Sequence, residues 1–374
     1  MIKKLFISTL LAVLLSSCSN SGNAEKAYKN GEFKQAYNLF SQQANKDDAY
    51  AQFKIGMMFF NGKGVEQNYD KSIQWLSKSA ENKYPKALFA LASIYHWGEG
   101  AKQDYSQALS YYKKAGSLGY ADAYYCIAGM FDKGDGVKKS PSKALEWYKK
   151  SALMGHQESQ HNIGVKYYHG KGITQDYKKA YKWLKMAADQ GSTKAQNGLG
   201  LMYVWGRGVK KNYSQAVKWY QKAAEQGYAE SQYNLAGKYE DGLGVTKDLN
   251  EAVNWYTKAA NQDHIRAQHN LALIYRNRKQ FIDATKWYRK AADQGYSLSQ
   301  YNLGTAYFNG DGVTKDLIQS HIWIKLAKDN GDKMAVDLLK VIDAMLKPEQ
   351  LKEAENLFLA KKEEIKKNIE KKKS

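Results

Sequence analysis

The stretch KAQNGLGLMYVWGRGVKKNYSQAVKWYQKAAEQG (residues 194–227) decides the fold of this chain. Its first half places Ala195, Leu199 and Tyr203 four residues apart, on one face of a helix predicted over residues 193–205. The Gly-Arg-Gly loop that follows ends this helix, because glycine readily adopts the left-handed conformation common at helix ends. A second helix then sets small alanines beside large aromatic side chains. This alternation is typical of helices that pack at close range, so the stretch predicts a helical hairpin.

The hairpin recurs along the chain with a period of 36 residues. The tryptophan of the second helix marks the period, with a substitute in two repeats, at Leu39, Trp75, Tyr111, Trp147, Trp183, Trp219, Trp255, Trp287 and Trp323. Only the step from Trp255 to Trp287 is shorter, at 32 residues, because the seventh repeat lacks four loop residues. One hairpin cannot bury its apolar face alone, so neighbouring hairpins must stack. The sequence therefore predicts an all-α solenoid of about eight helix-loop-helix repeats over residues 30–345.

We call a set of equivalent positions in successive repeats a column. Two further columns recur in the same register, and each has a structural explanation. The first contains only Gly or Ala, at positions 56, 92, 128, 164, 200, 236, 272 and 304. Glycine inside a helix costs about 0.5–1 kcal/mol relative to alanine, so we expect another helix to approach closely there. The second column consists of Asp104, Asp176, Asp248 and Asp316. These acids precede predicted helices, where they cap the N-terminus, and their periodicity argues against a catalytic role.

The N-terminus has the features of an export signal. Two lysines precede an apolar run and then small residues, so residues 1–17 are predicted to be a signal peptide. The run is shorter than the roughly 20 residues of a spanning helix. Leu15-Ser16-Ser17-Cys18 resembles the bacterial lipobox, which predicts acylation of Cys18 and a lipid anchor. Residues 18–29 are then the lipidated N-terminus and a linker, and Cys126, left without a partner, is expected to be a small buried residue.

The other end of the chain differs from the repeats. Residues 346–374 are predicted to form a capping helix, opened by Pro348, and a basic tail. The formal net charge is +20, and most of it is spread along the predicted solenoid. Such a charge favours anionic partners, and anionic lipid or glycan is a candidate in addition to protein. Nucleic acid is not expected, because an exported lipoprotein rarely meets it.

The repeat resembles the Sel1-like repeat, a relative of the tetratricopeptide repeat. The resemblance rests on Trp219-Tyr220, Ala223-Ala224, Gly227, Asn234-Leu235-Ala236, Tyr239, Gly242-Leu243-Gly244-Val245 and Asp248, and it covers about residues 30–345. It implies a right-handed solenoid that binds a partner in a concave groove. Cysteine-rich relatives linked to β-lactam binding carry a disulfide in each repeat, and this sequence lacks those cysteines.

Two columns of the first helix lie opposite its core face and form the predicted groove. The first column is Phe53, Phe89, Tyr125, His161, Asn197, Tyr233, His269 and Tyr301, and the last is Phe60, His96, Asp132, Tyr168, Val204, Glu240, Arg276 and Phe308. All of these except Asn197 and Val204 are candidate partner-binding residues, because exposed aromatic and charged residues anchor interfaces. The alternative is that the aromatic residues pack against the adjoining repeat.

No catalytic, metal or cofactor motif stands apart from the repeat, so we expect no enzyme activity, no cofactor and no metal. The sequence favours a non-catalytic protein-interaction scaffold of the bacterial cell envelope. Because Ser19 is not the Asp that retains lipoproteins at the inner membrane, the expected location is the outer membrane, facing the periplasm. Two alternatives stay open: a cell-wall-acting enzyme or peptidoglycan-binding protein, with Asp132 and His161 as the pair to test, and an immunity or host-interaction factor.

Overall fold

The computed structural model describes residues 22–371, and all regular structure in that range is helical. The chain divides into two compact units, Met1–Ala187 and Ala188–Ser374, with the boundary inside α10. Unit 1 contains a helix at residues 22–29, α2 (Phe33–Ala44), α3 (Ala49–Asn61), α4 (Tyr69–Glu81), α5 (Pro85–Trp97), α6 (Tyr105–Ser117), α7 (Ala121–Lys133), α8 (Pro141–Leu153), α9 (Gln157–His169) and most of α10 (Tyr177–Asp189). Unit 2 contains α11 (Thr193–Trp205), α12 (Tyr213–Glu225), α13 (Ala229–Asp241), α14 (Leu249–Ala260), α15 (Ile265–Asn277), α16 (Phe281–Ala292), α17 (Ser297–Asn309), α18 (Leu317–Asp329), α19 (Met334–Met345) and α20 (Pro348–Lys371).

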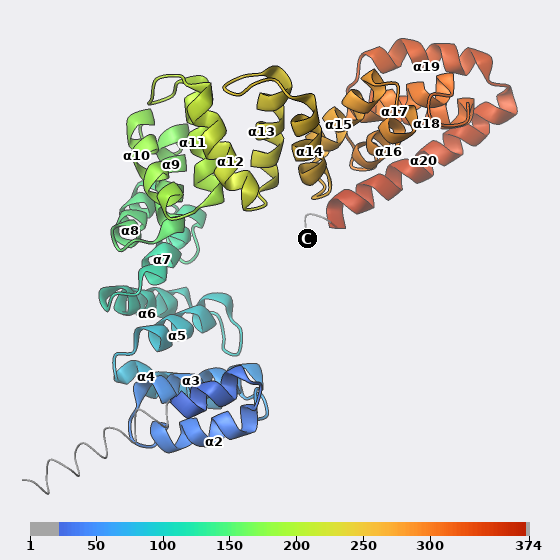
Figure 1. Ribbon diagram of the computed structural model, residues 1–374. Helices are drawn as coiled ribbons and strands as arrows, with labels where there is room; N and C mark the ends of the chain where they lie inside the picture. Colours follow the sequence, from blue (N-terminus) through green and yellow to red (C-terminus); the bar gives the residue numbers. More distant parts are fainter. Residues whose placement is uncertain (1–21, 372–374) are drawn as a thin grey trace, which may run out of the picture. The chain divides into compact units, whose positions relative to one another are not determined.

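Helices pack in series as antiparallel hairpins, which confirms the all-α solenoid (Figure 1). We call the first helix of each repeat the A helix (α3, α5 and so on to α17) and the second the B helix (α4, α6 and so on to α18). Within each unit, B helices also pack against the helix that follows them, as α4 does on α5 and α12 on α13. The predicted core residues Ala195 and Leu199 are buried, whereas Tyr203 is half-buried.

The Gly/Ala column lies where the A and B helices of one repeat meet. A Cβ atom built on Gly164 would lie 2.6 Å from Cγ of Leu184. On Gly304 it would lie 2.6 Å from Cγ1 of Ile324. Real carbon atoms do not approach so closely, so the predicted close approach is confirmed and its partner is the B helix of the same repeat.

The glycine loops do more than end the A helices. Gly206 caps α11 with φ 67°, as predicted. The second glycine of several pairs, such as Gly100 and Gly244, has a further task, because its loop lies against the start of the preceding B helix. A Cβ on Gly244 would lie 2.4 Å from the carbonyl carbon of Tyr213, so a side chain there would separate two repeats. The aspartate column also behaves as predicted, and Asp104, for example, accepts a hydrogen bond from the Gln107 amide at the start of α6.

A column of buried glutamines, which the sequence analysis did not single out, connects three helices at a time. Its members are Gln52, Gln160, Gln196, Gln232, Gln268 and Gln300. The side-chain amide of Gln268 donates to the Ala260 carbonyl at the end of the preceding B helix, at 3.0 Å. Its side-chain oxygen accepts from Nε2 of Gln294 at 2.8 Å. Both ends of the amide are thus paired, as burial of a polar group requires.

The two ends of the described chain extend further into regular structure than the sequence predicted. Residues 22–29, within the expected linker, form a helix in which Ala24 and Ala27 are buried. The expected basic tail is helical to Lys371, because α20 packs along α18 through Ala354, Phe358 and Ile365.

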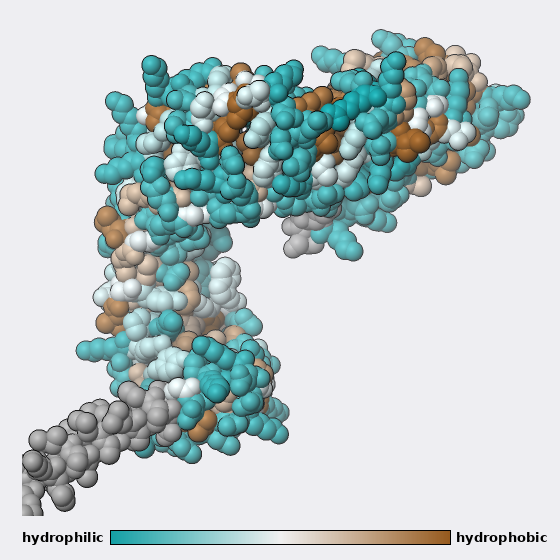
Figure 2. Space-filling model, in the orientation of Figure 1, coloured by the Kyte–Doolittle hydropathy of each residue, from teal (hydrophilic) through white to brown (hydrophobic). Residues whose placement is uncertain are grey.

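The surface of the chain is polar. On the face shown in Figure 2, hydrophilic side chains predominate and hydrophobic ones form small separate groups. Within residues 22–371, no helix has both the length and the hydropathy needed to span a bilayer. The predicted signal peptide and Cys18 lie outside the described residues.

Candidate functional site

The first predicted groove column lies between successive A helices. Its rings contact the residue that precedes the next A helix, with centroid distances of 5.3 Å for Phe53–Tyr84, 4.9 Å for Phe89–Tyr120, 4.9 Å for Tyr125–His156, 4.8 Å for Tyr233–His264 and 5.1 Å for His269–Tyr296. His161 contacts Asn162, and Tyr301 packs on the cluster around Ile324 and Leu339. The five ring pairs therefore join adjoining repeats, and a role of the column in partner binding stays a prediction.

The last column makes two kinds of contact. Its aromatic members Phe60, His96 and Tyr168 meet the first residue of their own B helix, with ring centroids 5.3–5.6 Å apart. Phe308 packs on the C-terminal cluster. The charged members form polar contacts: Asp132 with Lys166 at 2.6 Å, Glu240 with the Tyr256 hydroxyl at 2.7 Å, and Arg276 with Asn302 at 3.1 Å.

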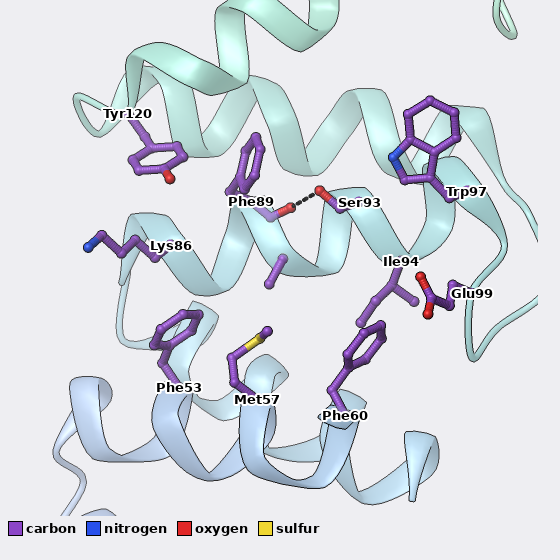
Figure 3. A pocket seen from close by; sticks show the side chains of 11 residues that line it. Phe53, Met57, Phe60, Lys86, Phe89, Ser93, Ile94, Trp97, Glu99 and Tyr120 are labelled. Atoms are coloured by element: carbon purple, nitrogen blue, oxygen red, sulfur yellow. Dashed lines mark hydrogen bonds between the residues drawn. The ribbon is translucent and has the colours of Figure 1, made fainter. Parts of the chain in front are cut away.

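Three of the predicted residues line one pocket in unit 1. Phe53 and Phe60 of α3 face Phe89 of α5 across a pocket of about 300 Å³. Figure 3 shows Met57 between the two α3 phenylalanines, pointing toward α5. The remaining lining residues are Lys86, Ala90, Ser93, Ile94, Trp97, Glu99 and Tyr120. A concave apolar site with a few polar groups at its edge is what binding sites commonly look like.

The two hydroxyl groups in the pocket wall are already paired. The Ser93 hydroxyl donates to the Phe89 carbonyl at 3.0 Å, a bond drawn in Figure 3. Burial raises the pKa of Tyr120, and the charge of Asp122 and a hydrogen bond to it add to the shift. The wall therefore offers a partner apolar surface and no unpaired hydroxyl.

Trp97 is the residue that the sequence analysis missed. It ends α5, its side chain stacks on buried His96 with centroids 4.4 Å apart, and it remains 63% exposed. A tryptophan so exposed on a soluble surface is a common anchor of interfaces. The sequence did point to Trp97, because its repeat position is polar in the neighbouring repeats, with Asn61 and Lys133, and contains tryptophan once more, at the 65% exposed Trp205.

The two histidines of the groove columns that lie deepest are kept neutral by burial. Burial lowers the pKa of His269 to about 4, and the Arg276 guanidinium lowers it further. Its Nδ1 lies 2.8 Å from the Ser299 hydroxyl. Burial also lowers the pKa of His96, although Asp135 opposes the shift. Both are therefore structural side chains at neutral pH.

Asp132 and His161, the two residues proposed for an enzyme site, each have another side-chain partner. Asp132 forms an ion pair with Lys166, and the ring of His161 contacts Asn162. Within residues 22–371, no three His, Cys, Asp or Glu side chains form a set that could hold a metal ion. Burial raises the pKa of the Cys126 thiol to about 11, so the thiolate needed for nucleophilic chemistry is scarce at neutral pH.

The repeats match a known family. The Sel1 repeat model matches eight consecutive stretches, at residues 49–84, 85–120, 121–156, 157–192, 193–228, 229–264, 265–296 and 297–332. The chain belongs to the Sel1 repeat family. Proteins of this family are generally protein-interaction scaffolds and typically have no catalytic activity.

Two solved structures of Sel1 repeat proteins resemble this one along most of the chain. A protective antigen present in uropathogenic Escherichia coli strains, which displays an SLR fold, is 31% identical, with a TM-score of 0.61 over 91% of this chain and 82% of that one. A Sel1 repeat protein from Oxalobacter formigenes is also 31% identical, with a TM-score of 0.67 over 82% of this chain and 89% of that one. No curated protein matches the sequence.

Proposed function

We propose that this Sel1 repeat protein is a non-catalytic scaffold of the bacterial cell envelope that binds a partner protein on the face of its A helices. The observation that carries the proposal is the apolar pocket between α3 and α5, with exposed Trp97 at its edge. Its wall residues come from the groove columns and from neighbouring A-helix positions. The interaction role of the family supports the same function.

The envelope location rests on the sequence. The signal peptide at residues 1–17 and the lipobox ending at Cys18 support export and lipid anchoring, and Ser19 favours the outer membrane, facing the periplasm. The charge of +20 supports an additional attraction to anionic lipid or glycan.

Two experiments test this function. Metabolic labelling with a fatty-acid precursor should label the wild-type protein and leave Cys18→Ala unlabelled and in the soluble fraction. Crosslinking in intact cells, followed by affinity capture and mass spectrometry, should recover one partner protein in excess over a capture from cells that express the Cys18→Ala protein. A labelled Cys18→Ala protein would contradict the anchor, and recovery of no enriched partner would contradict the scaffold.

A host-interaction role is the second candidate. It is favoured by the similarity to the protective antigen of uropathogenic Escherichia coli strains. This role requires the solenoid to be outside the cell. Protease treatment of intact cells should then digest it, whereas a periplasmic protein would be digested only after the outer membrane is permeabilised.

A further inference from the structure

We infer that the pocket between α3 and α5 binds an extended segment of the partner protein in which one large apolar side chain lies between an acidic and a basic residue. The inference rests on the proposed scaffold function and specifies its ligand. It follows from the wall of the pocket, the charges at its two ends and its length.

The wall selects an apolar side chain. Phe53, Met57 and Phe60 form one side and Phe89 and Ile94 the other (Figure 3). Met57 is flexible enough to adapt its shape to different apolar side chains. A pocket of about 300 Å³ is at the small end of ligand sites, so it suits one or two side chains better than a whole small domain.

The two ends of the pocket carry opposite charges. Lys86 lies in the first turn of α5, and Glu99 follows its last residue, Trp97 (Figure 3). Both are exposed, and neither forms an ion pair with any residue in the described part of the chain. Complementarity then requires an acidic residue of the ligand near Lys86 and a basic one near Glu99.

The length of the pocket fixes the spacing of those charges. Lys86 and Trp97 are eleven residues apart on one helix, which is about 16 Å at 1.5 Å per residue. An extended chain advances about 3.3 Å per residue, so the four steps from position i to i+4 cover about 13 Å, and the long side chains of Lys86 and Glu99 reach over the remainder. Alternate side chains of such a chain point to the same side. The expected ligand therefore carries its acidic, apolar and basic residues at positions i, i+2 and i+4, in either chain direction.

A helical ligand fits this site less well. A helix with its side chains is about 10–12 Å wide, whereas a pocket of about 300 Å³ has room for one or two side chains only. A single extended strand can insert one side chain between the two helices.

The test is selection of random nonapeptides displayed on phage against the full chain. The selected peptides should share an aromatic or large aliphatic residue flanked by opposite charges four residues apart. Selection against Lys86→Glu should keep the apolar residue and replace the acidic one by a basic one. Identical peptides from both selections, or no enriched peptide at all, would overturn the inference.

A matched pair of tryptophan variants localises the binding. Trp97 and Trp205 occupy the same repeat position and are exposed to 63% and 65%, so replacing either has a similar small effect on folding. A selected, fluorescently labelled peptide should bind Trp97→Ala at least tenfold more weakly than wild type, and Trp205→Ala within twofold of wild type. Equal affinity for Trp97→Ala and wild type would refute the site. If Trp97→Ala still captured the cellular partner, the pocket would be excluded and the scaffold function would stand.

Discussion

Replacing Gly164 by alanine should destabilise unit 1, although alanine is the better helix former. The added Cβ would lie 2.6 Å from Cγ of Leu184 and 3.2 Å from its backbone nitrogen. Overpacking of this kind costs about 1–3 kcal/mol, while the gain in helix propensity is about 0.5–1 kcal/mol. We therefore expect the free energy of unfolding to fall by about 1 kcal/mol.

Gly200→Ala is the matched control at the same repeat position. There the nearest atoms to the added Cβ all belong to the ring of Tyr220, the closest at 2.4 Å, and a ring can shift where a backbone cannot. Ala128 and Tyr148 form the equivalent pair in the third repeat, and both are buried in one cluster. Gly200→Ala should therefore leave stability unchanged or raise it by up to about 1 kcal/mol.

The assay is thermal and urea unfolding of the full chain followed by circular dichroism. A change of 1 kcal/mol shifts the Tm of a unit this size by roughly 2–4 °C. Since the two units can unfold separately, hydrogen exchange of peptides from α9 and α10 should show where protection is lost. The double variant Gly164→Ala/Leu184→Tyr, which copies the pair of the third repeat, should recover most of the loss. A Gly164→Ala protein as stable as wild type, or no recovery in the double variant, would refute this reasoning.

Three further predictions concern two buried polar side chains and one helix position that no neighbouring side chain covers. Gln268→Leu should lower the free energy of unfolding by about 1–3 kcal/mol, because the buried bonds that its amide forms with the Ala260 carbonyl and with Nε2 of Gln294 are lost, and urea titration measures this. Because the pKa of His269 is about 4 when folded and about 6.5 when unfolded, stability should fall by up to about 3 kcal/mol as the pH drops from 6.5 to 4. His269→Asn, which copies Asn197 of the fifth repeat, should remove that dependence in melts across this pH range. Gly129→Ala should raise stability by about 0.5–1 kcal/mol in thermal melts, because no atom lies within 4 Å of the added Cβ.

The features that recur in register could be predicted from the sequence. A column of Gly and Ala and a glycine loop recur with the 36-residue period, and an aspartate cap recurs in every second repeat, so chance matches average out over the array. The two ends of the chain do not repeat, so no equivalent positions supported a prediction there. The stretch at residues 22–29 is shorter than one repeat, and the part of α20 beyond residue 360 appeared as a charged tail because Ile365 stands there among Lys and Glu residues.

The site was harder to predict because a repeat position shows on which face of its helix a side chain lies, but not which residues of other helices it contacts. The sequence places Phe53 on the outer side of its A helix, but it does not reveal the contact with Tyr84, which lies 31 positions further along the chain. It also does not reveal that Asp132 and Lys166 meet. Only Trp97 could have been found, because its repeat position contains tryptophan in two repeats and a polar or charged residue in the other six.

In the sequence, every position of the last column is an equal candidate for the groove. The contacts in the structure imply different binding free energies for a partner at different positions. Where Asp132 meets Lys166, or Glu240 meets Tyr256, an entering partner must replace a hydrogen bond to a charged group, worth about 1.5–3 kcal/mol. At Phe60 the same position contributes only apolar surface, and a partner covers it without breaking a polar contact. We therefore expect the binding free energy of the proposed partner to be concentrated at the first two repeats, where it depends on what fits beside Phe60.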